Sequence, residues 1–370
     1  MAHGSRLVDL VHARIEGFLA ERTSILRSIS PDLEPLDTFS KRFLSGGKRF
    51  RALFCYWGWE AVAGRGFDPF EAEGGRDLFP VVSAASALEV FHAAALVHDD
   101  IIDNSDTRRG APSAHRLFEG LHAGSGWAGS SVDFGRAAAI LLGDLLLGWS
   151  DELLDEGLAP LPDQQAARAA RAEFVRMRTE VTVGQYLDIL EERAWIAQPD
   201  EEQRTRAERV IVYKAAKYSV ESPLAIGGAI AGATATQLDA LRGFGLPLGI
   251  AYQLRDDLLG VYGDPELTGK PSGDDLREGK RTMLIAIARE RLATGQRRLL
   301  DELLGDPDLA AEQVSMLQRT IADCGAVDEI ERLIADNLGR ATAALADAPF
   351  SRDAQAELGA LAKAVTRRSS

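Results

Sequence analysis

The stretch Val81–Ile102 is rich in alanine and almost free of charge until its last residues. Because a helix that is apolar on every side must be covered by other elements, we predict that Val81–Ile102 is the core helix of a bundle. Further segments repeat apolar residues at helical spacing, and no segment stands out with the alternation of a half-buried strand. These patterns predict an all-α fold.

The length of the chain, 370 residues, would by itself suggest two or three domains, but this expectation is weak for a large helical bundle. With 46% hydrophobic residues, the chain can bury a substantial core. We therefore predict a single domain over residues 1–370. Residues 64–78 and 120–135 are rich in glycine and polar side chains, and we predict that they form surface loops.

Charge and cysteine content restrict the partners of the chain. It has 42 lysines and arginines against 56 aspartates and glutamates, a net charge of −14, which argues against a nucleic-acid partner. Cys55 and Cys324 are far apart in the sequence, which is typical of a protein of the reducing cytoplasm and argues against a disulfide framework.

We expect neither a signal peptide nor a membrane span. Residues 1–14 are polar and mixed in charge, unlike a signal peptide, and residues 1–5 are compatible with a vector-derived remnant. The most apolar run, Ala137–Trp149, is broken by Gly143 and Asp144 and is too short to cross a bilayer. We therefore predict a cytoplasmic protein without stable membrane insertion.

Three aspartates end the core helix in a DDxxD pattern, Asp99, Asp100 and Asp103. Asp99 and Asp103 lie one helical turn apart, where like charges repel each other weakly. Mg²⁺ would reverse this repulsion, because it prefers oxygen ligands and usually binds one or two carboxylates together with substrate phosphates. Arg108 and Arg109 follow and offer bidentate donors for a diphosphate. The alternative interpretation is a solvated acidic helix end.

A second candidate anion site lies near the N-terminus. Two glycines precede a helix that opens with three cations, in the segment Gly46–Arg51. Free N–H groups, the positive end of the helix dipole and side-chain charge would coincide there. An ordinary basic helix start is the alternative.

Another acidic pair, Asp256 and Asp257, ends a second core helix. Two acidic helix ends on one cavity can hold metal ions, and these ions can bind a diphosphate that carboxylates alone would repel. Lys214, Lys270 and Lys280 are candidates for the remaining phosphate oxygens, although each alone is more typical of a solvated charge.

Taken together, these motifs resemble those of the trans-isoprenyl diphosphate synthases (the polyprenyl synthetase family), most closely bacterial geranylgeranyl diphosphate synthases. They occur in the order of the family and span most of the chain: Gly46–Arg51, His92–Pro112, Gly143-Asp144, Gly184-Gln185, Lys214–Ala216, Tyr252–Asp257, Thr268–Pro271 and Asp275–Thr282. The resemblance implies a single large helical bundle around a central cavity. It also implies a Mg²⁺-dependent prenyltransferase that condenses isopentenyl diphosphate head to tail with an allylic diphosphate.

The resemblance implies a role for each matching residue. Asp99 and Asp103 would hold two Mg²⁺ ions with support from Asp100. Asp256 would bind a third Mg²⁺ ion directly, and Asp257 would support it without direct contact. The allylic diphosphate would be bound by Arg108, Lys214, Lys270 and Lys280. The diphosphate of isopentenyl diphosphate would be bound by Lys48, Arg51, His92 and Arg109. Gln253 would orient the allyl group or its metal shell. For His92, a core histidine is the alternative.

Two positions depart from the family pattern. Gly260 replaces the third aspartate of the second acidic motif, which would weaken binding of the third Mg²⁺ if that carboxylate is needed. Ala215 replaces a threonine or serine of many relatives and removes a hydroxyl contact.

Product length is predicted from the helix that carries Asp99. Ala94 and Ala95 are expected to leave a tunnel open for the growing chain, and Phe91 is expected to form its floor. We therefore predict an all-trans product of twenty carbons, geranylgeranyl diphosphate. Farnesyl, geranylfarnesyl or longer products are the alternatives.

Two other protein classes are alternatives to a prenyl diphosphate synthase. A class I terpene cyclase shares the DDxxD motif but needs no second diphosphate pocket. A non-catalytic subunit of a heteromeric synthase would have lost acidic motifs that this chain retains. Family precedent predicts a homodimer.

Overall fold

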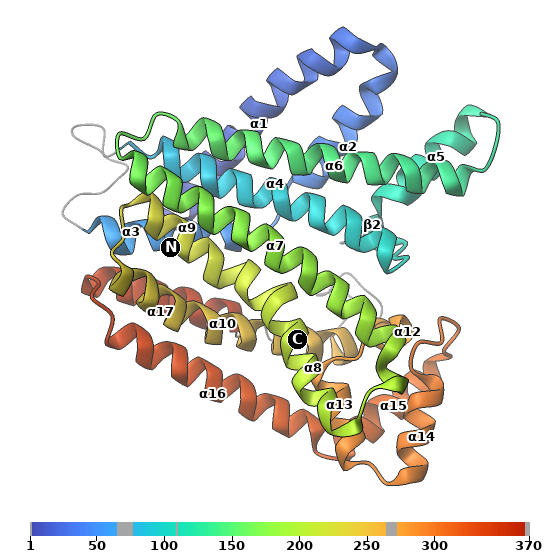
Figure 1. The fold of residues 1–370 in the computed structure, drawn as a ribbon. Coiled ribbons are helices and arrows are strands. Elements are labelled where there is room, and N and C mark those ends of the chain that lie inside the picture. Colours follow the sequence, from blue (N-terminus) through green and yellow to red (C-terminus); the bar gives the residue numbers. More distant parts are fainter. Residues whose placement is uncertain (1, 65–76, 109, 264–271, 367–370) are drawn as a thin grey trace. The chain divides into compact units, whose positions relative to one another are not determined.

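The computed structural model describes residues 2–64, 77–108, 110–263 and 272–366. Their regular structure is helical (Figure 1), apart from the two-residue strands β1 (Thr107–Arg108) and β2 (Ala111–Pro112). The strands pair antiparallel, with Thr107 opposite Pro112 and Arg108 opposite Ala111. The prediction of an all-α fold is confirmed.

The chain divides into two compact units. The first comprises Met1–Ala172 and Pro223–Ala233, and the second comprises Glu173–Ser222 and Thr234–Ser370. Helix α7 (Gln164–Ala194) begins in the first unit and ends in the second. The single-domain assignment stays a prediction.

The first unit is built on the predicted core helix. Its helices are α1 (Ala2–Ile29), α2 (Glu34–Leu44), α3 (Phe50–Ala63), α4 (Phe79–Ile102), α5 (Ala114–Ser125), α6 (Ser131–Leu158) and most of α9 (Ser222–Ile230), with the 3-10 turn η1 (Pro31–Leu33). Helix α4 packs against α1, α3 and α6 (Figure 1). By length and composition α4 would also suit a membrane span, but 83% of its apolar window is buried inside the protein, as in a core helix.

Glycine allows α6 to approach α4 closely. A Cβ atom added at Gly143 would lie 2.3 Å from Nε2 of His98, and one at Gly157 would lie 2.5 Å from Cβ of Ser83. The motif Gly143-Asp144 therefore lies opposite the residue that precedes the first acidic pair. The space that a larger side chain would need is filled by the His98 ring.

The predicted surface loop over residues 120–135 is wrong for most of its length. Helix α5 continues to Ser125 and α6 begins at Ser131, so that only residues 126–130 connect them. Trp127 in this short connection packs against Phe134, with ring centroids 5.3 Å apart. The longer loop was predicted from the glycine and serine content of the segment, and this content does not reveal apolar contacts such as that between Trp127 and Phe134. Residues 65–76 of the other predicted loop lie outside the described residues.

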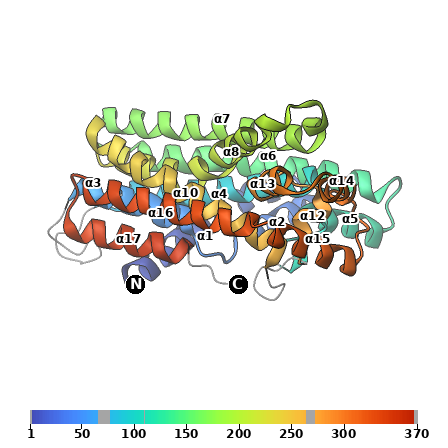
Figure 2. The ribbon, with the colours of Figure 1, turned by 90° about the horizontal axis from the view of Figure 1, so that it is seen from below.

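The second unit is built around α10 (Ala235–Tyr262), which packs against α16 (Ala326–Ala346; Figures 1 and 2) and against η4 (Ile211–Glu221). Its other elements are η2 (Trp195–Ala197), η3 (Asp200–Glu202), α8 (Gln203–Val210), the π-helical η4 (Ile211–Glu221), α12 (Asp274–Glu278), α13 (Met283–Arg291), α14 (Thr294–Leu303), α15 (Ala311–Asp323), α16 (Ala326–Ala346) and α17 (Arg352–Thr366). A capping box at Thr234 and Gln237 starts α10. The α-helical backbone of α8 passes directly into the π-helical η4 at Ile211.

Candidate active site

The first acidic motif lies at the carboxyl end of α4, as predicted. Asp103 follows the helix directly, and its N–H donates to the carbonyl oxygen of Asp99 at 2.8 Å, so that the two residues are one turn apart. The Asp99 side chain is 20% exposed, whereas that of Asp100 is buried. The three aspartates therefore do not form a uniformly solvated helix end.

Arg108 joins two of these aspartates. Its Nε donates to Oδ1 of Asp100 at 2.8 Å, and its Nη2 lies 3.4 Å from Oδ2 of Asp99. The buried Asp100 thus anchors the arginine, and the arginine in turn lies beside Asp99. A phosphate oxygen near Asp99 would meet this guanidinium, which can donate to two oxygens at once. Arg109 lies outside the described residues.

One face of α4 stays partly exposed over the two turns that precede the acidic motif. His92, Ala95 and Asp99 keep partial exposure, whereas Phe91 and Ala94 are 3% and 0% exposed. The spacing of three and four residues puts the open positions on one side of the helix. Ala95 therefore shares the face of Asp99, whereas Ala94 is packed in the core.

The Gly46–Arg51 segment forms a tight connection between α2 and α3. Gly46, Gly47 and Arg49 have positive φ angles of 68°, 92° and 50°. Lys48 is exposed and Arg51 is half-buried. The expected role of free backbone N–H groups is wrong at Ala52, whose N–H donates to Oε1 of Glu89 at 3.2 Å.

Sequence reasoning missed Glu89. The signal was present, because Glu89 is the sole charged residue between Val81 and Ala95 in the core helix. A buried carboxylate in such a helix must have a partner, and the partner here is Arg49.

The second acidic motif combines an exposed and a buried carboxylate. Asp256 is exposed, and Asp257 is 6% exposed and accepts a hydrogen bond from Nε2 of Gln253 at 2.8 Å. Burial raises the pKa of Asp257 to about 8, against the opposing effect of the Gln253 hydrogen bond. These environments suit Asp256 as the metal ligand and Asp257 as its support.

Asp275 occupies the space beside Gly260. A Cβ atom added at Gly260 would lie 1.9 Å from Oδ2 of Asp275. Oδ1 of the same carboxylate lies 3.6 Å from Nζ of Lys280, which also pairs with Glu278 at 2.6 Å. The departure at Gly260 therefore makes room for a carboxylate that comes from α12. Lys270 lies outside the described residues.

Lys214 lies on η4, where α7 approaches closely. A Cβ atom added at Gly184 would lie 2.4 Å from the backbone nitrogen of Lys214. One turn further along α7, Asp188 forms an ion pair with Nζ of Lys214. Asp188 had no predicted role. Its place one turn after Gly184 in the same motif region was the signal that could have found it. Because it pairs with Lys214, Asp188 positions the lysine. Ala215 is buried.

The predicted residues are shared between the two units. Asp99, Asp100, Asp103, Arg108, Lys48, Arg51 and His92 lie in the first unit, whereas Lys214, Gln253, Asp256, Asp257 and Lys280 lie in the second. Among the described residues, no three potential metal ligands form a group. Asp99 and Asp103 are one turn apart, and Mg²⁺ usually binds one or two carboxylates and completes its shell with phosphate oxygens and water.

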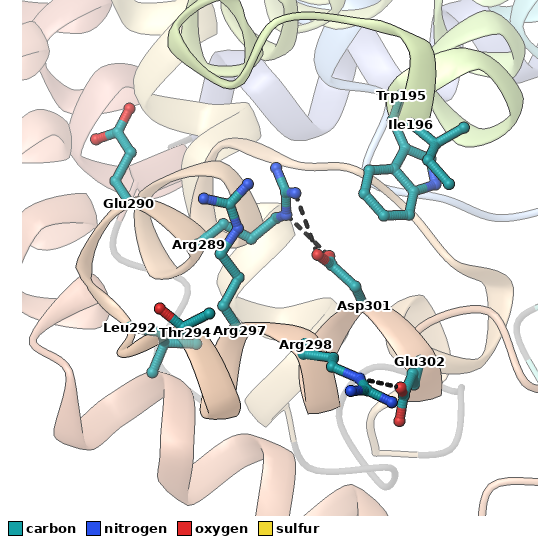
Figure 3. A pocket seen from close by; sticks show the side chains of 10 residues that line it. All are labelled: Trp195, Ile196, Arg289, Glu290, Leu292, Thr294, Arg297, Arg298, Asp301 and Glu302. Carbon is teal, nitrogen blue, oxygen red and sulfur yellow. Dashed lines mark hydrogen bonds and ion pairs between the residues drawn. The ribbon is translucent and has the colours of Figure 1, made fainter.

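A pocket of about 460 Å³ lies elsewhere in the second unit, between Trp195 and α13–α14 (Figure 3). None of the predicted site residues lines it. Arg289, which lines the pocket, donates to Asp301, and Arg298 donates to Glu302 (Figure 3). The guanidinium of the neighbouring Arg281 lies 3.6 Å from the centroid of the Trp195 ring. Because these arginines are paired with carboxylates or stacked, we interpret the pocket as structural.

Residues 34–321 match the polyprenyl synthetase family. The chain belongs to this family, and it is a prenyltransferase. The match spans both units and includes all the residues to which we assigned a role.

Solved structures and characterised relatives agree with this family. The geranylgeranyl pyrophosphate synthase of Corynebacterium glutamicum, solved with isoprenyl diphosphate and magnesium, is 36% identical and aligns over 98% of this chain and 99% of its own, with a TM-score of 0.88. The geranylgeranyl diphosphate synthase of Sulfolobus acidocaldarius is 32% identical over 74% of this chain and 72% of its own. The geranylfarnesyl diphosphate synthase of Aeropyrum pernix is 31% identical over 78% of this chain and 79% of its own. The fold is thus of the isoprenoid synthase type.

Proposed function

We propose that this prenyltransferase condenses isopentenyl diphosphate with an allylic diphosphate and releases all-trans geranylgeranyl diphosphate. The open face of α4 carries the proposal, because it aligns His92, Ala95 and Asp99. Charge for a diphosphate and space for an apolar chain are thereby adjacent on one helix. The similarity to two geranylgeranyl diphosphate synthases supports the twenty-carbon product.

The donor sets suit Mg²⁺. Asp99 and Asp103 offer carboxylates one turn apart, and the exposed Asp256 offers another. When bound, Mg²⁺ would neutralise the charge that develops on the leaving diphosphate. The number of three ions per site stays a prediction.

The residues of the chain would bind and orient both substrates. Arg108, Lys214 and Lys280 would bind the allylic diphosphate and stabilise it as the allylic C–O bond breaks. Lys48, Arg51 and His92 would hold isopentenyl diphosphate so that its double bond attacks the allylic cation. The new C–C bond leaves a tertiary cation, which loses a proton to the released diphosphate. Exclusion of water protects the cations.

The direct test incubates the protein with Mg²⁺, isopentenyl diphosphate and each short allylic diphosphate, and measures product chain length. We expect turnover that requires isopentenyl diphosphate and yields mainly the twenty-carbon product. Turnover of an allylic diphosphate without isopentenyl diphosphate would indicate a terpene cyclase instead. Mainly twenty-five-carbon product would favour the second candidate, a geranylfarnesyl diphosphate synthase, which the Aeropyrum pernix relative supports.

Restoring the aspartate of relatives at position 260 should lower activity. In Gly260→Asp, the new side chain would displace the Asp275 carboxylate from its place beside Lys280. We expect kcat/KM for the allylic diphosphate to fall about tenfold. Gly243→Asp in the same helix is the matched control. Gly243 is exposed, and a Cβ atom added there would lie no closer than 3.7 Å to another side chain, at Cβ of Ala344. Wild-type kinetics in Gly260→Asp would show that Asp275 has no such role.

A homodimeric state, a cytoplasmic location, and the absence of membrane insertion and of a nucleic-acid partner stay predictions. The two acidic motifs are retained, which supports an active enzyme rather than a non-catalytic subunit.

A further inference from the structure

The connection before α3 has an unusual backbone. Arg49 adopts a left-handed conformation with a φ angle of 50°, directly after Gly46 and Gly47, which also have positive φ angles. Glycine tolerates this region, whereas a residue with a Cβ atom is strained there. Such strain persists only where surrounding contacts hold the residue in place. The contacts of Arg49 must therefore hold the connection in this conformation.

The side chain of Arg49 is turned into the protein, although the nearest cations before and after it in the sequence, Lys48 and Arg51, are not buried. Its residue exposure is 7%, whereas Lys48 is exposed and Arg51 half-buried. The guanidinium donates to the carbonyl oxygen of Leu44 at the end of α2. Its Nη1 also lies 3.3 Å from Oε2 of Glu89. The left-handed turn thus directs one of three neighbouring cations inward.

Glu89 holds both sides of the same connection. It lies on α4 and is 5% exposed. While Oε2 pairs with Arg49, Oε1 accepts a hydrogen bond from the N–H of Ala52 at 3.2 Å. Because the side chain of the N-cap residue Arg49 makes no capping hydrogen bond to α3, the Glu89 carboxylate acts as the N-terminal cap from a neighbouring helix. One carboxylate therefore binds groups on both sides of the pair Phe50-Arg51: the Arg49 guanidinium before it and the Ala52 N–H after it.

This position couples the connection to His92. Glu89 and His92 are three residues apart on α4, and residues at that spacing are neighbours on a helix surface. Lys48 and Arg51 are adjacent to the two groups that Glu89 binds. Three of the four residues assigned to isopentenyl diphosphate, Lys48, Arg51 and His92, thus lie next to the groups that this buried ion pair holds, or one turn from Glu89 itself.

We propose that Glu89 and Arg49 are positioning residues that set the geometry of the isopentenyl diphosphate site through Lys48 and Arg51. The inference rests on the proposed function. Since Glu89 also binds the Ala52 N–H, the incoming diphosphate is recognised by side chains and not by that backbone group. A misplaced connection should therefore weaken binding of isopentenyl diphosphate and leave the allylic substrate unaffected.

The test compares KM values for the two substrates in Glu89→Gln. This variant keeps the size of the side chain and an oxygen for the Ala52 N–H, but it removes the charge that pairs with Arg49. We expect KM for isopentenyl diphosphate to rise about tenfold, with KM for the allylic diphosphate within about twofold of wild type. Arg49→Lys, which keeps the charge but not the forked donor, should give a smaller rise.

The matched control is Glu60→Gln. Glu60 is a carboxylate on α3 that is 6% exposed, but it lies at the other end of the helix. Glu60→Gln should leave KM for isopentenyl diphosphate and KM for the allylic diphosphate unchanged. In a Lys48→Ala background, Glu89→Gln should raise KM for isopentenyl diphosphate by a smaller factor than it does alone, because the part of its effect that acts through Lys48 is already lost.

A purely structural role would give another pattern. It would lower the melting temperature or kcat with both KM values unchanged, or it would add fully to Lys48→Ala, and either result would overturn the proposal. If Glu89→Gln does not fold, the same comparison with Arg49→Lys decides, and an unchanged KM for isopentenyl diphosphate would overturn it. A wild-type protein that does not consume isopentenyl diphosphate would instead refute the proposed function.

Discussion

Replacing Asp99 by alanine should abolish nearly all turnover while leaving the fold intact. We expect kcat to fall roughly 10³-fold, because one of the two carboxylates proposed to bind Mg²⁺ at this helix end is lost. The fold should persist, since Arg108 keeps its 2.8 Å hydrogen bond to the buried Asp100. Steady-state prenyl transfer and circular dichroism measure the two effects.

A nearby exposed aspartate is the control for this variant. Asp106 lies in the same segment but pairs with Arg116 on the surface, so Asp106→Ala should keep turnover within about twofold of wild type. Asp99→Asn should require more Mg²⁺ for half-maximal rate than wild type, because an amide is a poorer ligand than a carboxylate. Full prenyl transfer by Asp99→Ala would contradict the proposed active site.

Product length should change in opposite directions at Phe91 and Ala95. Phe91→Ala removes the predicted floor and should lengthen the main product by at least one five-carbon unit. Ala95→Phe places a ring on the open face one turn before Asp99 and should shorten the product to fifteen carbons. Chromatography of the hydrolysed products measures both shifts.

Ala94 provides the matched control for Ala95. Ala94 is fully buried, so Ala94→Phe should destabilise the fold by about 1–3 kcal/mol through overpacking without shortening the product. Because Phe91 is 3% exposed, its loss should cost about 3–5 kcal/mol, and thermal unfolding must show that the variant is folded at the assay temperature. An unchanged product in folded Phe91→Ala would exclude Phe91 as the floor.

The helical class and the acidic motifs were readable from the sequence because they depend on local order. Apolar periodicity determines a helix and its buried face, and DDxxD places two carboxylates one turn apart wherever that helix lies. The family motifs added roles for Lys214 and Lys280 that composition could not supply. The roles of all these site residues stay predictions, and Arg109 and Lys270 lie outside the described residues.

Contacts between distant segments decided the rest. Whether Ala94 or Ala95 faces the open side depends on how α4 packs against its neighbours, and both are alanines in the sequence. Similarly, the partners of Gly260 and Arg49 come from α12 and α4, far along the chain, so no local pattern predicts them.

The sequence by itself therefore determined which chemistry-bearing residues the chain carries and which helices bear them. Only the tertiary structure decided which of them are buried, paired or open: Asp100 holds Arg108, Asp188 holds Lys214, and Glu89 caps α3 from another helix. The physical reason is that helix formation follows from neighbouring residues, whereas a buried charge is stabilised by whichever partner the packing brings to it.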